Sequence, residues 1–470
     1  MAAKTQVYRW DFNVFDFAQS VKGKPLYNVT MALLQDQGLL DGWLLDRPVV
    51  EAYLTRVESM YKPNPYHNNT HAADVTQTAG VIMCALDARL RYGSSDGSAS
   101  SSSSCCSSCC NVGGGTVGSK LANALACCTL PHAKAAATAA VAAAQAPPSA
   151  AAGNPAQPPQ PLAASGGSPG GGLAKLERFA IILASAVHDL GHPGVNNAFL
   201  VRSRDKHALT YNDRSVNENM HASLAFTLAA EEPGLNLFAR FSPAEYEQVR
   251  KLVLDMVLST DMDVHFKLLK AFEDELASAP DVATWASLEQ RSLLFQMLVH
   301  LADLANPSRP WHLALTWAEW VVTEFLQQVR RPGRGGHGMR GVRGQGRREA
   351  SCGLAVSDMC NEAKVCMPAA QLFFIERFML PTLEAFRPAA PAFYRLALPW
   401  LGDTRAKWEA FKAGGVKLPR TGYPALPPGG EAQLCAVLEG SSGCTCSASH
   451  AQGQVQEQQQ QVLARIGQQQ

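Results

Sequence analysis

The chain has 470 residues, with 41 Lys and Arg against 40 Asp and Glu, so its formal net charge is +1. This balance argues against a general nucleic-acid-binding protein and against a strongly acidic, solvating one. No run of about 18 uncharged apolar residues occurs, so we predict no transmembrane helix. The N-terminus lacks the apolar segment of a signal peptide. We therefore expect a cytoplasmic protein whose thirteen cysteines are reduced.

The first part of the chain, residues 7–91, has the pattern of compact helical sequence. Apolar residues recur at helical spacing over 29–40 and 49–61. The composition then changes to Ser, Cys, Gly, Ala and Pro over 92–172, and such a segment buries too little apolar surface to fold. We predict a disordered insertion there. Its cysteines could bind a metal, or carry palmitate and attach the protein to a membrane surface, but low-complexity drift is the simpler interpretation.

Ordered sequence resumes after 172 and continues to about 412, with a Gly- and Arg-rich break at 330–352. Alternating Val, Ile and Thr runs bounded by turn residues are scarce, which favours an all-α fold over a mixed one. We predict one domain of about 14–16 helices over 1–412, interrupted by the insertion and by the Gly/Arg-rich loop. Residues 413–470 are rich first in Pro and Gly and then in Gln, which predicts a disordered tail.

The first motif with chemical potential is the segment 66–74, Tyr-His-Asn-Asn-Thr-His-Ala-Ala-Asp. His67 and His71 are four residues apart, so on a helix they would share a face. Two histidines at this spacing often begin a metal site. The pair alone is equally typical of structural or surface histidines.

Two further motifs follow apolar helical runs. His188 and Asp189 come directly after the run 179–187, and Asp303 follows the run 293–299. Burying a carboxylate is costly unless a metal or a hydrogen-bonding partner satisfies it, so either a metal site or a core His-Asp pair is compatible with each motif alone.

Taken together, two histidines and two aspartates suit Zn²⁺ with a position left open for water. An adjoining site that shares one aspartate and is completed mostly by waters suits Mg²⁺. Two ions about 3.5–4 Å apart hold a bridging hydroxide and a phosphoryl oxygen, which is the chemistry of phosphate-ester hydrolysis.

At this point the sequence resembles the catalytic domain of class I 3′,5′-cyclic nucleotide phosphodiesterases. The run His-Asp-Leu-Gly-His-Pro-Gly-Val-Asn-Asn-Ala-Phe at 188–199 is similar to the signature of that family. Further blocks occur in the family's order at 66–75, 211–219, 259–262, 300–307 and 371–374. The resemblance covers about residues 8–91 and 172–412 and implies the fold and activity of the family.

The resemblance also implies roles for individual residues. The zinc ligands would be His71, His188, Asp189 and Asp303. Asp189 would bridge to a second ion, Mg²⁺ or Mn²⁺. His67 would be the general acid that protonates the O3′ leaving group, with Glu218 as its partner, and a histidine suits this role because its pKa lies near working pH. His192 and Thr260 would orient the waters of the ions.

A purine pocket is implied as well. Gln371 would hydrogen-bond the purine edge, and Phe374 would stack on the purine opposite Val321. Tyr66, Met262, Leu304 and Asn306 would form the rest of the pocket, with Trp317 and Phe325 in its wall. Asn306 gives a slight preference for cAMP over cGMP.

Three residues depart from the family pattern. Gly191 stands where an acidic residue is common, Met220 where a histidine is common, and Phe373 where a glycine is frequent. None of these changes removes an expected ligand. Gly191 leaves open whether one contact to metal-bound water is made, and Phe373 leaves open the volume of the purine pocket.

The expected function is hydrolysis of a cyclic nucleotide, cAMP or cGMP, to the 5′-nucleoside monophosphate. Two alternatives remain at this stage: another His-Asp phosphohydrolase acting on nucleotides, and a non-catalytic regulatory or scaffold relative. A zinc protease is disfavoured because the chain contains no His-Glu-x-x-His motif.

Overall fold

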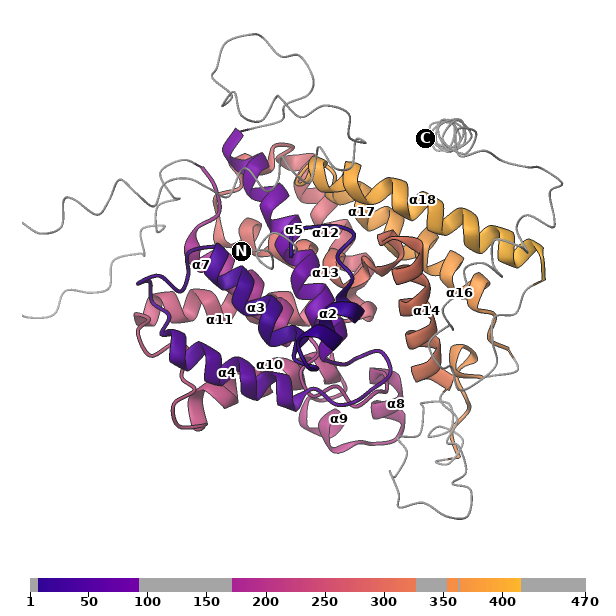
Figure 1. Ribbon diagram of the computed structural model, residues 1–470, viewed down its shortest axis with the longest axis horizontal. Helices are drawn as coiled ribbons and strands as arrows, with labels where there is room; N and C mark the ends of the chain where they lie inside the picture. Colours follow the sequence, from indigo (N-terminus) through magenta and orange to yellow (C-terminus); the bar gives the residue numbers. More distant parts are fainter. Residues whose placement is uncertain (1–6, 93–170, 327–352, 362–363, 416–470) are drawn as a thin grey trace, which may run out of the picture.

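The computed structural model describes residues 7–92, 171–326, 353–361 and 364–415 (Figure 1). The segments predicted to be disordered, 92–172 and 413–470, lie outside these residues except at their ends, and the predicted Gly/Arg-rich loop at 330–352 lies wholly outside them. Within the described parts the chain forms 15 α-helices and no strand, which confirms the predicted all-α fold.

The elements are short to medium in length, apart from two long helices. In chain order the α-helices are α2 (Val14–Ser20), α3 (Pro25–Asp36), α4 (Arg47–Met60), α5 (Asn69–Tyr92), α7 (Lys175–Val187), α8 (Asn197–Arg202), α9 (Lys206–Thr210), α10 (Val216–Glu231), α11 (Pro243–Leu258), α12 (His265–Ser278), α13 (Leu288–Leu304), α14 (Trp311–Leu326), α16 (Met367–Phe374), α17 (Leu380–Phe386) and α18 (Pro391–Ala413). Four 3-10 turns, η1 (Met262–Val264), η2 (Val282–Thr284), η3 (Asn306–Ser308) and η4 (Asp358–Cys360), and one π turn, η5 (Ile375–Met379), complete the described chain.

Helix α5 is the central element, and it packs against α3, α7 and α13. Its 24 residues are buried over most of their length. Gly80 allows α3 to approach closely, because a Cβ at that position would lie only 2.8 Å from Leu33 Cδ2. This packing brings three parts of the site together. His71 lies in the first turn of α5, α7 ends one residue before His188, and Asp303 lies in the last turn of α13.

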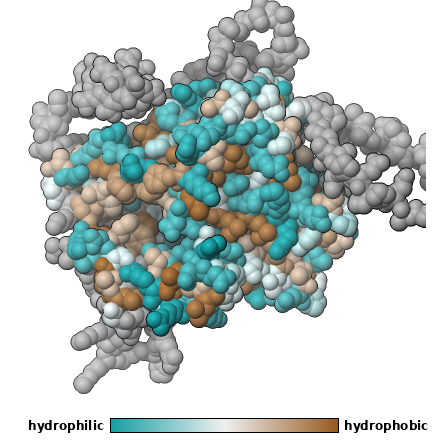
Figure 2. All heavy atoms as spheres, turned by 180° about the vertical axis from the view of Figure 1, so that it is seen from behind, coloured by the Kyte–Doolittle hydropathy of each residue, from teal (hydrophilic) through white to brown (hydrophobic). Residues whose placement is uncertain are grey.

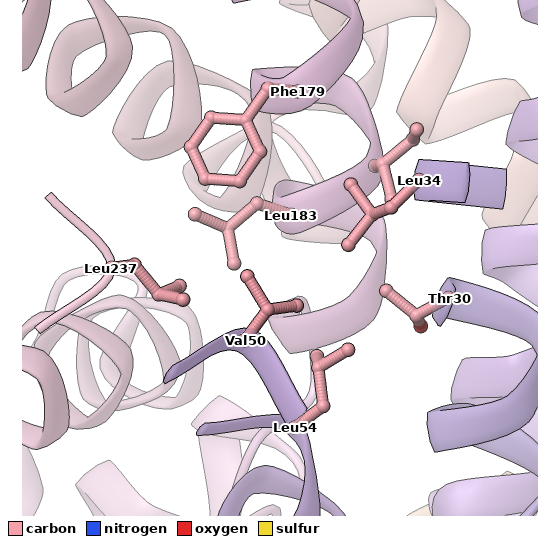
Figure 3. A pocket seen from close by; sticks show the side chains of 8 residues that line it. Thr30, Leu34, Val50, Leu54, Phe179, Leu183 and Leu237 are labelled. Carbon is pink, nitrogen blue, oxygen red and sulfur yellow. The ribbon is translucent and has the colours of Figure 1, made fainter. Parts of the chain in front are cut away.

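A small apolar hollow lies between α3, α4 and α7 (Figure 3). The side chains that line it are Thr30, Leu34, Val50, Leu54, Phe179, Ile182, Leu183 and Leu237. Thr30 is the one polar residue among them, and its hydroxyl has no hydrogen-bond partner. A hollow of this composition offers no group that could do chemistry, so it is a feature of core packing.

None of the described helices combines the length and the apolar character that crossing a bilayer requires. Hydrophilic and hydrophobic residues are intermixed over the face shown in Figure 2. Phe266 and Phe373 are among the large apolar side chains that stay exposed.

The two ends of the 92–172 segment meet on the surface of the domain. A Cβ on Gly171 would lie 3.3 Å from the carbonyl oxygen of Leu90, and the backbone N–H of Leu173 donates to Asp87 Oδ1 at 2.7 Å. The described residues on the two sides of this segment therefore lie next to each other.

We expect a variant lacking residues 95–168 to fold and keep its activity. The four residues that remain between Tyr92 and Gly171 can connect these adjacent ends. Each halving of a loop lowers the entropic cost of its closure by about 0.6 kcal/mol, so the free energy of unfolding should stay equal or rise by up to about 2.6 kcal/mol. Chemical denaturation of both proteins measures this, and an unfolded deletion variant would show that the segment is structural.

Candidate metal centre and active site

A short loop and the first turn of α5 position His67 and His71. The side chain of Asn68 caps the helix, because its Oδ1 accepts hydrogen bonds from the backbone N–H groups of Thr70 at 2.8 Å and His71 at 3.1 Å. His67 therefore precedes the helix, and the expectation that both histidines share a helix face is wrong. Their rings nevertheless lie close together, with centroids 5.9 Å apart.

The other two parts of the cluster follow the ends of buried helices. α7 ends at Val187, and the next two residues are His188 and Asp189. Gly191 then turns the chain with a φ of +78°, a conformation that glycine adopts without strain. Asp303 lies in the last turn of α13.

The packing of these helices brings His71, His188, Asp189 and Asp303 together. His71 Nε2 lies 3.1 Å from Asp303 Oδ1 and 3.5 Å from Asp189 Oδ2. His188 Nε2 lies 3.3 Å from Asp189 Oδ2 and 3.5 Å from Asp303 Oδ1. Each imidazole nitrogen thus faces one oxygen from each carboxylate, although the chain separates these residues by up to 232 positions.

These distances fit a tetrahedral ion. Zinc bonds to nitrogen and oxygen are about 2.0–2.2 Å long, so ligand atoms on one tetrahedral ion lie about 3.3–3.5 Å apart. His188 donates from Nδ1 to the carbonyl oxygen of Ser185 at 2.9 Å, which leaves the lone pair of Nε2 for a ligand. That Nε2 is buried and makes no hydrogen bond with any described residue. The donor set therefore has the composition and spacing of a metal site.

Asp189 presents its second oxygen to a neighbouring group. Oδ1 lies 3.7 Å from His221 Nε2, and the two residues form a further potential metal-binding group with His192. One aspartate can thus serve two adjacent positions, as a bridging carboxylate does.

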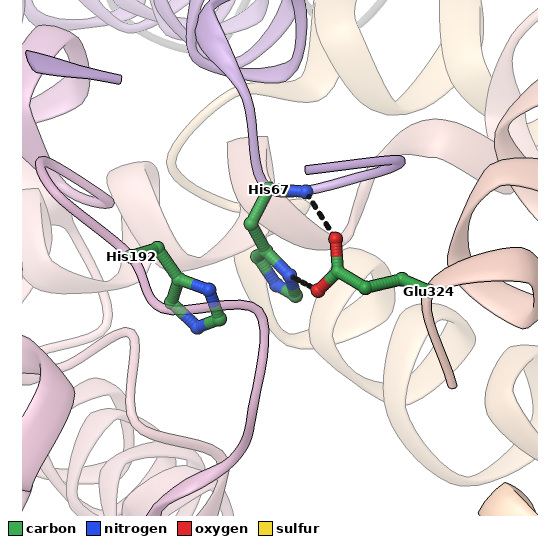
Figure 4. A group of neighbouring side chains, drawn as sticks. All are labelled: His67, His192 and Glu324. Carbon is green, nitrogen blue, oxygen red and sulfur yellow. Dashed lines mark hydrogen bonds and ion pairs between the residues drawn. The ribbon is translucent and has the colours of Figure 1, made fainter. Parts of the chain in front are cut away.

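His67 lies beside this cluster and is held by Glu324 of α14 (Figure 4). Glu324 Oε1 lies 2.5 Å from His67 Nδ1, and Oε2 accepts the backbone N–H of His67 at 3.0 Å. The His192 ring stacks on the His67 ring with centroids 4.0 Å apart. A histidine with this carboxylate partner can carry a proton on its other ring nitrogen, Nε2.

Comparison with known proteins agrees with this geometry. Residues 167–397 match the 3′5′-cyclic nucleotide phosphodiesterase family. The chain is 27% identical over 407 residues to 3′,5′-cyclic-AMP phosphodiesterase 4C of Mus musculus. The aligned residues cover 86% of this chain and 45% of that protein. Residues 167–397 of this chain are a class I cyclic nucleotide phosphodiesterase domain. His67 and His71 lie outside the matched range, but their side chains complete the cluster of the family domain.

Two further matches extend the comparison. A probable 3′,5′-cyclic phosphodiesterase pde-1 of Caenorhabditis elegans is 27% identical over 380 residues, covering 80% of this chain and 41% of that protein. The phosphodiesterase domain of the RhoPDE fusion protein from the choanoflagellate Salpingoeca rosetta shares the fold, with a TM-score of 0.61 at 21% identity, covering 87% of this chain and 96% of that one. The chain spans about half the length of the curated relatives it matches.

In this phosphodiesterase domain Glu218 does not pair with His67, so that expectation is wrong. Glu218 Oε2 accepts from Asn197 Nδ2 at 2.9 Å, and Asn197 Oδ1 accepts the backbone N–H of Asn217 at 2.9 Å. These bonds join the block at 188–199 to the block at 211–219. Burial, with added repulsion from Asp261, raises the pKa of Glu218 to about 8.

The electrostatics of the cluster favour positive charge at its centre. Burial alone would raise the pKa of Asp303, but His188 and His71 hold it well below its ordinary value. Burial alone would also lower the pKa of His67, but the carboxylates of Glu324 and Asp189 outweigh it and raise that pKa to about 9. Both effects meet the electrostatic requirement of a cation site.

The residues expected to orient water are also buried near the cluster. His192 Nδ1 accepts the backbone N–H of Gly194 at 3.0 Å. Thr260 donates its hydroxyl to the carbonyl oxygen of Val257 at 2.8 Å, so its lone pairs stay available as acceptors. Burial lowers the pKa of His192 well below its ordinary value and favours a neutral ring.

The residues expected around the purine come from five elements, α13, α14, α16, η1 and η3, and from the loop before α5. Gln371 and Phe374 lie on α16, which packs against α14 with Val321, and all three are partly buried. Leu304 is buried at the end of α13, whereas Met262 is exposed on η1. The purine pocket itself stays a prediction.

Two of the three departures have a structural consequence. At Gly191 a Cβ would lie 2.7 Å from Leu224 Cδ1, so the backbone there suits glycine and not an acidic residue. Phe373 is 56% exposed, with its ring centroid 5.9 Å from that of Phe378. Its side chain therefore extends to the surface. Met220 is simply buried.

The sequence analysis missed three residues of the site: Glu324, His221 and Asn64. Asn64 Nδ2 donates to the carbonyl oxygens of both His67 and His192 at 2.9 Å and so joins the two loops. His221 donates from Nδ1 to the carbonyl oxygen of Leu190 at 2.7 Å. A signal existed for Glu324, because it is one of two carboxylates, with Glu319, in the largely apolar sequence of α14.

Proposed function

We propose that this chain is a metal-dependent phosphodiesterase that hydrolyses the 3′-ester bond of cAMP, with cGMP as the alternative substrate, to give the 5′-monophosphate. The observation that carries the proposal is the position of His67, paired with Glu324, beside a cluster of two imidazole nitrogens and two carboxylates. The printed name of the mouse relative, a cyclic-AMP phosphodiesterase, supports cAMP as the preferred substrate.

We assign Zn²⁺ to the group His71, His188, Asp189 and Asp303, and Mg²⁺ or Mn²⁺ to the side that Asp189 Oδ1 faces. When bound, the two cations neutralise phosphate charge and lower the pKa of a water molecule. The protein supplies the orientation of these ligands. His188 is fixed by its hydrogen bond to Ser185.

His67 is the proposed general acid. Its Nδ1 is occupied by Glu324, so Nε2 is the nitrogen that gives a proton to O3′ as the ester bond breaks. The raised pKa of His67, about 9, keeps the imidazolium form present at neutral pH. The stacked ring of His192 limits the rotation of His67.

Glu218, His192 and Thr260 are proposed to hold the attacking water. Glu218 is partly buried, and desolvation with repulsion from Asp261 raises its pKa to about 8, so it can exchange a proton near neutral pH. For the purine we propose a hydrogen bond from Gln371 and stacking between Phe374 and Val321. The remaining wall residues would be Tyr66, Met262, Leu304 and Asn306.

Replacing Glu324 with Gln should shift the pH dependence of kcat. The carboxylate raises the pKa of His67, so its removal lowers that pKa, by about 1–3 units for a buried opposite charge. The acid form exists below the pKa, and the alkaline limb of the kcat profile should therefore move to lower pH. A profile from pH 5 to 10 measures this shift. An unmoved alkaline limb would show that Glu324 does not tune His67.

The test of the proposed function is parallel hydrolysis of cAMP and cGMP by the purified chain, with and without a chelator. We expect a 5′-monophosphate product, loss of turnover with the chelator, and recovery on adding Zn²⁺ and Mg²⁺. Chromatography separates 5′-AMP from 3′-AMP and so identifies the bond that breaks. A metal-loaded protein that hydrolyses neither nucleotide would contradict the proposal and support a scaffold role.

A further inference from the structure

A buried ion pair lies directly behind the candidate metal site. Arg309 Nη2 donates to Asp74 Oδ1 at 2.8 Å, and the two side chains are 0% and 3% exposed. Asp74 follows His71 by three residues on α5, and Arg309 follows Asp303 by six residues, just after η3. A buried pair contributes little stability relative to apolar residues of the same size, so stability alone does not account for it.

The second carboxylate oxygen of Asp74 is also engaged. Asn306 Nδ2 donates to Asp74 Oδ2 at 3.1 Å, and Asn306 Oδ1 accepts from Tyr66 Oη at 2.6 Å. Asn306 is 7% exposed, and it follows Asp303 by three residues. Its amide orientation is fixed from both sides, and its bonds connect the turn of α5 that carries His71 with the end of α13.

Arg309 fixes the pair further to α5 and to the N-terminal segment. Its Nη2 also contacts Gln77 Oε1 at 2.5 Å and Thr78 Oγ1 at 2.6 Å. Its Nη1 donates to the carbonyl oxygen of Trp10 at 3.1 Å, and its guanidinium lies 4.2 Å from the centroid of the Trp10 ring. The pair is thus the centre of a network and not an isolated contact.

His71 differs from the other buried histidines of the site in how its ring is held. His188 and His221 each have a backbone carbonyl oxygen as a partner for Nδ1, at 2.9 and 2.7 Å. Such a bond normally fixes the ring of a metal-binding histidine. His71 Nδ1 is buried but has no hydrogen-bond partner among the described residues. The ring of Tyr66 lies over it instead, with centroids 4.5 Å apart.

We infer that Asp74, Asn306 and Arg309 are positioning residues that hold His71 opposite Asp303 and thereby set the geometry of the tight metal site. They act through the backbone of α5 and η3 and through the ring of Tyr66, whose hydroxyl Asn306 holds. All three lie outside the proposed ligand set. The amide of Asn306 is thereby assigned to the site's framework and not to reading the purine. The inference rests on the proposed metal site.

The test is the rate at which a chelator removes Co²⁺ from the loaded protein, followed by the visible absorption of the bound ion. The Asp74→Asn substitution keeps the shape of the side chain and removes its negative charge. We expect Co²⁺ to leave about 10- to 100-fold faster than from the wild type, the range seen when groups that orient metal ligands are removed. Circular dichroism and thermal unfolding show whether the variant is folded.

Asn306→Ala is the second variant, and it leaves the ion pair of Asp74 and Arg309 in place. We expect the same faster loss of Co²⁺, with a larger change in kcat than in KM. A raised KM with wild-type Co²⁺ retention would instead assign Asn306 to substrate binding and overturn the inference.

Glu177→Gln is the matched control. Glu177 and Arg291 form a second, mostly buried ion pair, at 2.6 Å, which links the beginnings of α7 and α13. This pair lies 11 residues before His188, about 16 Å along the helix. The control should unfold at a lower temperature but hold Co²⁺ within about twofold of wild type. Wild-type retention in both Asp74→Asn and Asn306→Ala would overturn the inference. A wild-type chain that binds no ion would overturn the metal site and the proposed function with it.

Discussion

Asp303→Asn should yield a folded protein without its tightly bound ion and without measurable cyclic-nucleotide hydrolysis. Asp303 Oδ1 lies 3.1 Å from His71 Nε2 and 3.5 Å from His188 Nε2, so it closes one side of the proposed tetrahedral site. The substitution removes a negative charge from the ligand set and replaces a strong oxygen donor with a neutral amide. The effect should exceed the roughly 10- to 100-fold loss of affinity that follows changes outside the ligand set.

Metal content by mass spectrometry and kcat measured on the same preparation check this expectation. Asp263→Asn is the control, since Asp263 lies in η1 and is exposed. It should keep both metal and turnover. An Asp303→Asn protein with wild-type metal content and rate would remove Asp303 from the site.

His67→Ala should have the second largest effect, and it should act on the rate alone. The ligands of the proposed ions are unchanged, so metal content should equal that of the wild type. Without an acid at O3′ the leaving group departs as an alkoxide, and general acid catalysis typically contributes about 10²–10⁴-fold. We therefore expect kcat to fall by about that factor while KM changes little.

The surface provides a matched histidine for comparison. His207 pairs with Asp205 at 2.9 Å, as His67 pairs with Glu324, but it lies on α9 and not beside the proposed ligands. His207→Ala should leave kcat unchanged. If His67→Ala turned over cAMP at the wild-type rate, His67 would have no role as the acid.

Sequence alone could predict the fold class and the proposed ligand residues because their signals are local. His188 and Asp189 follow an apolar helical run, as Asp303 follows another, and a polar group at the end of a buried helix needs a partner. The helical periodicity at 29–40 and 49–61 corresponds to α3 and α4, with ends that differ by about four residues or fewer. The turn that actually places His67 before α5 depends on the side chain of Asn68, which composition and spacing do not reveal.

The partners of these residues could not be predicted, because they depend on contacts between distant parts of the chain. Glu324 and His67 are 257 positions apart, and Asp74 and Arg309 are 235 apart. A carboxylate in an apolar helix indicates that it has a buried partner, but it does not identify that partner. The family resemblance implies Glu218 as the partner of His67 for the same reason, because a sequence motif does not show which side chains meet. In the structure Glu218 accepts a hydrogen bond from Asn197 instead.

X-ray absorption at the zinc edge, recorded on the zinc-loaded full-length chain, tests the central claim most directly. The account predicts one tightly held zinc with imidazole nitrogen and carboxylate oxygen ligands at about 2.0–2.2 Å. The same spectrum from Asp303→Asn should lose this signature. Sulfur ligands at about 2.3 Å, or no retained zinc, would contradict the account, because the ion would then lie on cysteines or be absent from the group formed by His71, His188, Asp189 and Asp303.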